Sequence, residues 1–124
     1  GKIMADEITL IVDLDLVNGN IEHDFSPSSI SIDQATARFI DTVLDIGTSE
    51  ETISFGDISA KGMVVLQNLD STNFINYGPD STGMVTLGRL NAGEVAAFRI
   101  DNAATLIAQA NTATCKMRFI AYEN

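Results

Sequence analysis

The sequence predicts an all-β fold, an antiparallel β-sandwich of jelly-roll type with eight to ten short strands. Apolar and polar residues alternate with a period of two along most of the chain, and helix signals are scarce. Turn-forming residues recur at intervals of about 8–12 residues, a spacing typical of sandwiches and jelly rolls. The chain has 124 residues and no linker-like stretch, which predicts a single sandwich domain over residues 1–124.

The N-terminal stretch alternates most clearly. In Glu7–Val17 every second residue from Ile8 onward is apolar, which predicts a half-buried strand with a wet outer side. Asn18-Gly19-Asn20 follows, and Asn-Gly is a strong hairpin signal because both residues tolerate positive φ. A second strand is predicted over Ile21–Phe25, ending at the Ser26-Pro27-Ser28-Ser29 break.

The stretch Ile30–Ile46 fits two patterns. Ile30 and Ile32 alternate with serines, as in a strand, whereas Ala37, Ile40, Val43 and Leu44 also form a helical stripe. The β character of the surrounding chain favours a strand, but the sequence leaves strand and helix open here.

Short strands are predicted through the remainder of the chain, after a polar loop over Gly47–Glu51. Turns rich in Asn, Asp, Gly and Ser separate them. The predicted strands are Ile53–Phe55, Gly62–Leu69, Phe74–Tyr77, Met84–Leu90, Val95–Ile100, Leu106–Ala110 and Cys115–Tyr122.

The composition excludes some classes of partner. Seventeen acidic against seven basic residues give a formal charge of −10, which disfavours binding to nucleic acid or to an anionic membrane surface. A single cysteine rules out an intrachain disulfide and suits a reducing compartment. The first residues lack the apolar core of a signal peptide, and Met4 is compatible with the original start, with Gly1–Ile3 as a cloning remnant.

No residue pattern predicts catalysis, a cofactor or a metal site. The one histidine, His23, shares a strand face with Ile21 and Phe25, which places it at the edge of the core in a structural role. Cys115 shares a face with Met117 and Phe119, which predicts a buried thiol that acts as a small hydrophobe.

Other polar and aromatic residues allow weaker hypotheses. Asp13 and Asp15 could pair as hydrolase carboxylates, but on a wet strand face they are more simply solubilising. Asp70 and Asp80 lie in loops where calcium could bind, without the spacing of an EF-hand. The candidates for an exposed, sugar-binding aromatic are Tyr77, Tyr122 and Phe74.

Two features are compatible with a homo-oligomer. Lys116 and Arg118 are predicted on the outer face of the last strand, while the outer face of the first strand is acidic. Opposite charges that meet across subunits set register more than they add affinity. Small side chains also allow strand faces to pack closely, namely Ala96, Ala97, Ala103, Ala104, Ala108 and Ala110.

The C-terminal half, from about Met63 to Asn124, carries a series of turn motifs. The run Asn68–Gly78 reads NLDSTNFINYG, Arg89–Glu94 reads RLNAGE, and Ala108–Ala113 reads AQANTA before a last apolar strand that ends in Tyr122-Glu123. Asp70, Ser71 and Asn73 can bond their own backbone in a tight turn, and Gly93 can supply a positive φ. These motifs form turns and contain no catalytic residues.

This half resembles a module of small structural proteins of tailed bacteriophages. In that module the second turn has a proline where this chain has Ala92. The resemblance implies a non-enzymatic virion protein, most simply a capsid decoration or cement protein that forms homotrimers and binds the major capsid protein. The alternative it implies is a carbohydrate-binding or tail- or fibre-attachment module used in host adsorption. Either protein is assembled in the cytoplasm of an infected bacterium.

Overall fold

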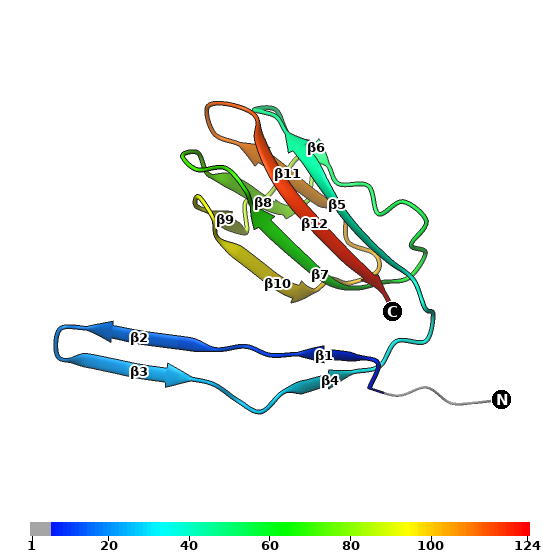
Figure 1. Cartoon of the computed structure of the whole chain (residues 1–124). Helices are drawn as coiled ribbons and strands as arrows, with labels where there is room; N and C mark the ends of the chain where they lie inside the picture. The colour runs from blue at the N-terminus through cyan, green and yellow to red at the C-terminus, as the bar shows by residue number, and fades with distance from the viewer. Residues whose placement is uncertain (1–5) are drawn as a thin grey trace. The chain divides into compact units, whose positions relative to one another are not determined.

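The computed structural model describes residues 6–124, which form twelve antiparallel β-strands and no helix (Figure 1). The predicted all-β antiparallel architecture is therefore confirmed. The strand number exceeds the predicted eight to ten because the stretches Glu7–Val17 and Ile30–Ile46 each form two strands. None of the described residues forms a helix long and apolar enough to cross a membrane. Met4 and Gly1–Ile3, on which a chain start was predicted, lie outside the described residues.

Contacts within the chain divide it into two compact units, one ending at Thr36 and the other running Ala37–Asn124. The single sandwich domain predicted over residues 1–124 is corrected accordingly, because the sandwich occupies only the second unit. The alternation in the first unit does produce strands, but they pair with each other and join neither sheet of the sandwich.

The first unit is a long two-stranded hairpin. β1 (Ile8–Leu10) pairs with β4 (Ile30–Ile32), and β2 (Leu14–Asn18) pairs with β3 (Ile21–Phe25). Figure 1 shows the two ladders end to end, in blue to cyan. The predicted single strand Glu7–Val17 is thus broken at residues 11–13. The predicted turn is confirmed, and Gly19 occupies its first central position with φ of 59°.

The second unit is a sandwich of two four-stranded sheets. One sheet has the order β10-β7-β12-β5 and the other β6-β11-β8-β9 (Figure 1). Pairing is nested, because β5 pairs with β12, β6 with β11, β7 with β10 and β8 with β9. One long hairpin rolled into two sheets in this way is a jelly roll, as predicted. The strands are β5 (Phe39–Ile46), β6 (Glu51–Thr52), β7 (Lys61–Asn68), β8 (Ile75–Pro79), β9 (Gly88–Leu90), β10 (Val95–Arg99), β11 (Leu106–Ala110) and β12 (Cys115–Glu123).

The ambiguous stretch Ile30–Ile46 is strand, in the form of β4 and β5. Ile40, Leu44 and Ile46 in β5 face the core, whereas Val43 is exposed, so the period is two and not that of a helix. The predicted strand Ile53–Phe55 is wrong, since β6 ends at Thr52. Only the last three residues of the predicted strand Met84–Leu90 form a strand, β9.

The core lies between the two sheets of the sandwich. Phe119 of β12 packs edge to face on Phe55, with ring centroids 5.2 Å apart. Large side chains from both sheets surround them, and Ile46, Leu66, Ile75 and Met117 are almost wholly buried. Cys115 is fully buried in this cluster, which confirms the predicted position of the thiol.

Candidate interaction surfaces

The turn after β7 is held by side-chain hydrogen bonds to its own backbone. Asp70 Oδ2 accepts hydrogen bonds from the backbone N–H groups of Thr72 and Asn73, at 3.0 and 2.6 Å. These bonds lower the pKa of Asp70 below its usual value, because they stabilise the charged carboxylate. The predicted role of Asp70 is confirmed. Asn73 differs from the prediction, because its side-chain oxygen accepts a hydrogen bond from Thr112 in the loop before β12.

Asn68, at the start of this motif, is fully buried and joins three segments. Its Nδ2 donates to the carbonyl oxygens of Asn73 and Leu90, at 2.8 and 3.0 Å, and its Oδ1 accepts from Asp70 N–H. The backbone carbonyl of Asn68 also accepts from Gly93 N–H, in the second turn motif, where Gly93 has the predicted positive φ of 80°. The two motifs therefore form one structural unit.

A buried carboxylate at the end of β12 is a further feature that sequence reasoning missed. Glu123 is only 3% exposed, and it accepts hydrogen bonds from the N–H and hydroxyl of Ser59 and from Arg38. Arg38 also donates to the carbonyl oxygen of Asp57. The carboxylate thus fastens the loop before β7 to the last strand.

His23 is exposed in β3, opposite Leu16, so the prediction that it lies at the edge of the core is wrong. The alternation of β3 is real, but the side that it shares with Ile21 and Phe25 has no core beneath it within the hairpin. Asp15 is also exposed and pairs across the ladder with Asp24, whereas Asp13 lies in the break between β1 and β2. The structure therefore does not bring Asp13 and Asp15 together in a cleft.

Within residues 6–124 there is no group of three or more His, Cys, Asp or Glu side chains arranged to hold a metal ion. Asp80 instead accepts a hydrogen bond from the N–H of Gly83, at 2.9 Å, within its own loop. Burial raises the pKa of the Cys115 thiol, and the charge of Asp70 raises it further, so the thiol is held in its neutral form.

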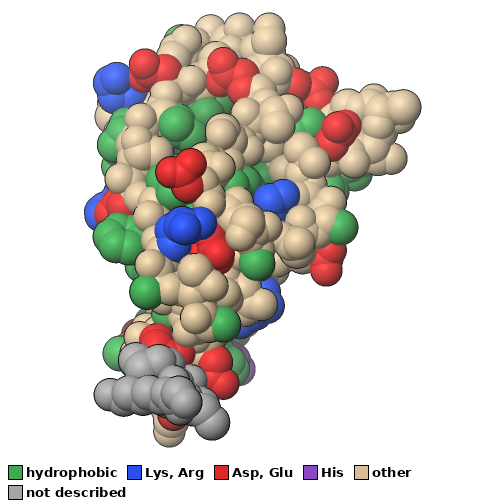
Figure 2. Space-filling model, turned by 90° about the vertical axis from the view of Figure 1, so that its right-hand side faces the viewer, with side chains coloured by type: hydrophobic (Ala, Val, Ile, Leu, Met, Phe, Trp, Pro, Cys, Tyr) green, Lys and Arg blue, Asp and Glu red, His purple; other side chains and the backbone are tan. Residues whose placement is uncertain are grey.

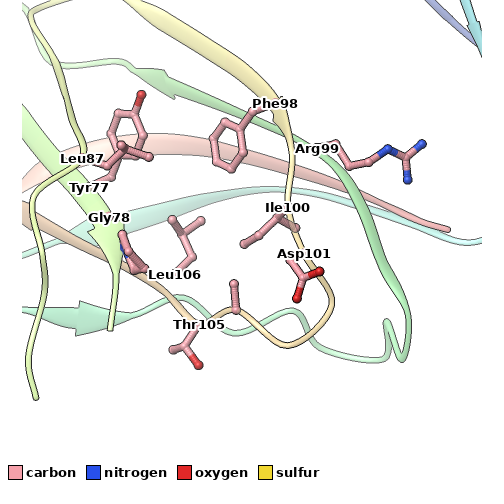
Figure 3. A pocket seen from close by; sticks show the side chains of 11 residues that line it. Tyr77, Gly78, Leu87, Phe98, Arg99, Ile100, Asp101, Thr105 and Leu106 are labelled. Atoms are coloured by element: carbon pink, nitrogen blue, oxygen red, sulfur yellow. The ribbon is translucent and has the colours of Figure 1, made fainter. Parts of the chain in front are cut away.

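A small apolar groove opens between the sheets beside β10 (Figure 3). Tyr77 and Phe98 stack nearly parallel in its wall, with ring centroids 6.1 Å apart, and Leu87 lies beside Tyr77. Asp101 and Thr105 supply polar groups, while the side chain of Arg99 points away from the groove. Its volume of about 190 Å³ is below the range of about 300–1,000 Å³ common for small-molecule sites.

The wall of this groove depends on a glycine in β8. The chain after β8 folds back on it, and Val85 N–H and Leu87 N–H donate to the carbonyl oxygens of Pro79 and Tyr77. A Cβ on Gly78 would lie 1.8 Å from the carbonyl oxygen of Val85, so a side chain here would force the two backbone segments apart. The glycine therefore permits the close approach of residues 85–87 to β8, which places Leu87 in the wall of the groove.

The outer face of the β10-β7-β12-β5 sheet carries apolar side chains among polar ones, which include Gln67 and Arg99. Its Lys116 and Arg118 are paired within the chain, with Asp45 at 2.9 Å and with both carboxylate oxygens of Asp41 at 2.9 and 2.6 Å. Apolar side chains fill the positions between these ion pairs. They are Phe39, Val43, Met63, Val65, Val95, Ala97, Ile120 and Tyr122. On the face of the molecule drawn in Figure 2, hydrophobic side chains likewise reach the surface between charged ones.

The three aromatic residues considered for a sugar site are only half-buried, and they lie in different places. Tyr77 lines the groove, Tyr122 lies near Phe39 with ring centroids 6.2 Å apart, and Phe74 lies under the guanidinium of Arg89.

Comparison of the chain with protein-family models, with curated proteins and with solved structures finds no match.

Proposed function

We propose that this chain is a non-enzymatic structural protein of a tailed-phage virion, a decoration or cement protein that self-associates and binds the major capsid shell. The observation that carries the proposal is the amount of apolar sheet surface that one copy leaves in water. Monomeric soluble proteins rarely expose contiguous apolar patches larger than a few hundred Å². The hairpin exposes Leu14, Ile21 and Phe25, and one sheet of the sandwich exposes Phe39, Val43 and Val95.

The architecture and the resemblance of the turn motifs point the same way. Jelly rolls recur in viral capsid proteins, and their flat sheet faces suit side-by-side packing. The Asn68–Asn73 and Arg89–Glu94 motifs carry the resemblance to phage structural proteins. Their hydrogen bonds stabilise the turns themselves. The excess of acidic residues keeps a crowded particle surface soluble and repels nucleic acid.

Sedimentation with phage particles tests this proposal. The labelled chain is mixed separately with purified heads and purified tails of a candidate phage and spun through a sucrose cushion. We expect saturable co-sedimentation with heads, at a fixed number of copies per particle. Saturable binding to tails alone would favour the attachment module, and absence of binding to both would refute a virion role.

A carbohydrate-binding role in host adsorption is the second candidate, and the groove beside β10 favours it. Aromatic faces can pack on the apolar side of a sugar ring, and a carboxylate and a hydroxyl can bind its hydroxyl groups. The groove supplies these groups from Tyr77, Phe98, Asp101 and Thr105. A glycan array tests it, with Leu87→Asp as the variant at the groove and Leu69→Asp as the matched exposed control. Binding lost only in Leu87→Asp supports this role, and an array without signal removes it.

A further inference from the structure

The hairpin is amphipathic across its width. In the β2–β3 ladder, Leu14 lies opposite Phe25 and Leu16 opposite His23, which places these side chains on one face. The other face carries Asp15 opposite Asp24 and Val17 opposite Glu22. The β1–β4 ladder repeats the pattern, with an apolar face and a face of Thr9 and Ser31. Its apolar side chains are Ile8, Leu10, Ile30 and Ile32.

This apolar face is too exposed for a hairpin that stands alone. Leu14 is 63% exposed, Ile21 62% and Phe25 49%. An isolated two-stranded hairpin is at best marginally stable in water, and a third strand or a packed layer is needed to bury its hydrophobic face. The hairpin therefore needs a covering surface.

The sandwich offers one surface of matching character. Ala97, Val65 and Ile120 lie side by side across β10, β7 and β12, and the neighbouring Val43 and Val95 are 51% and 55% exposed. The outer face of the opposite sheet is different, because its strands present polar side chains there. These are Asn76, Arg89 and Gln109. The exposed large apolar side chains within the strands of the sandwich, Phe39, Val43 and Val95, all lie on the outer face of the β10-β7-β12-β5 sheet.

Electrostatics favour this sheet face, rather than a second hairpin, as the partner of the apolar face of the hairpin. Residues 6–36 contain seven carboxylates and no lysine or arginine, so two hairpins repel each other. The outer face of the β10-β7-β12-β5 sheet carries three cations, Arg99, Lys116 and Arg118, against the two carboxylates Asp41 and Asp45. Arg99 forms no salt bridge with any described residue.

We propose that the apolar face of the hairpin of one copy packs on the outer face of the β10-β7-β12-β5 sheet of a second copy. This inference rests on the self-association in the proposed function, and it specifies which two surfaces of the chain meet. The two surfaces differ, so the contact is head to tail, and such contacts close into rings when the rotation between copies allows.

Two charge substitutions test the contact, each with a matched control. Leu16→Glu lies on the apolar face of the hairpin and Val17→Glu on its acidic face. Val43→Glu lies on the outer face of the sheet, and Leu69→Glu lies in the turn after β7. All four side chains are at least 45% exposed, so we expect the variants to fold, which circular dichroism checks. Light scattering coupled to size exclusion then gives the mass of each.

We expect the unaltered chain, Val17→Glu and Leu69→Glu to share one oligomeric mass, and Leu16→Glu and Val43→Glu to fall to the monomer mass of 13.3 kDa. An equimolar mixture of Leu16→Glu and Val43→Glu then forms dimers, because the intact hairpin of one variant meets the intact sheet of the other. If Val43→Glu keeps the full mass while Leu16→Glu loses it, the hairpins pair with each other and the proposal is wrong. A mixture that stays monomeric also overturns it.

The same variants separate this contact from the proposed function. If both remain oligomeric and still co-sediment with phage heads, the virion role stands and only this mode of association fails. If the unaltered chain is monomeric and binds no particle, the virion role itself fails.

Discussion

Asp15 lies directly opposite Asp24 in the β2–β3 ladder, on the face of the hairpin away from its apolar side chains. Like charges opposite each other in a ladder are destabilising. Hydrogen bonding with Asp24 raises the pKa of Asp15 above its usual 3.8, with a smaller contribution from desolvation. Asp15 therefore keeps its proton to a higher pH in the hairpin than in the unfolded chain.

The hairpin is therefore expected to lose stability as the pH rises. A folded-state pKa above the unfolded value gives a stabilising contribution that is complete below pH 3.8 and is lost as pH rises through the raised pKa of Asp15. Asp15→Asn removes the repulsion and keeps a hydrogen-bond donor. We expect greater amide protection in β2 and β3 at neutral pH, with little pH dependence.

Hydrogen exchange corrected for its intrinsic pH dependence measures this, with Asp13→Asn as the control outside the ladder. Equal protection profiles for Asp15→Asn and the unaltered chain would contradict the pairing.

Asn68→Ala is expected to be among the most destabilising single substitutions in the sandwich. It leaves the carbonyl oxygens of Asn73 and Leu90 and the N–H of Asp70 without the partners that they have in the fold. Buried unsatisfied polar groups cost about 1–3 kcal/mol each, so we expect a loss on the order of 3 kcal/mol in the free energy of unfolding. Urea unfolding measures it, and the exposed Asn91→Ala should cost less than about 0.5 kcal/mol.

Gly78→Ala is expected to detach the segment that folds back on β8. The added methyl overlaps the carbonyl oxygen of Val85, and overpacking typically costs about 1–3 kcal/mol. Protection of Val85 N–H and Leu87 N–H from hydrogen exchange should fall more than that of the core strands. Gly47→Ala is the control, since the nearest atom to its Cβ is 3.7 Å away. Unchanged protection of Val85 and Leu87 would show that the close approach is not needed.

The Cys115 thiol is expected to resist labelling in the folded protein. It is fully buried, and desolvation raises its pKa above the usual 9.0, so the reactive thiolate is scarce at neutral pH. Reaction with a chromogenic disulfide reagent should follow the unfolding rate, whereas a cysteine introduced by Leu69→Cys should react at once. Immediate labelling of Cys115 would contradict its burial.

Local patterns made the jelly roll predictable. The alternation in β5 and β12 and the contacts of Asp70, which reach only two and three residues along the chain, are properties of short segments. The bond from Asn68 to Leu90 and the bonds from Ser59 to Glu123 were not predicted because these partners are distant in sequence, by 22 and 64 positions.

The hairpin shows where alternation stops being informative. The same period of two arises whether a strand covers its own core or a surface elsewhere, so β2 and β3 were predicted correctly as strands and incorrectly as part of the sandwich. His23 was misplaced for that reason. The interaction surfaces emerge only once the register shows which exposed apolar side chains share a face.

Sedimentation equilibrium of the unaltered chain tests the central claim most directly, that these apolar faces are covered by association. At micromolar concentration we expect a mass that is a whole multiple of 13.3 kDa. This mass should stay constant on dilution until the oligomer dissociates to monomers. A mass of 13.3 kDa throughout, up to millimolar concentration, would contradict the account.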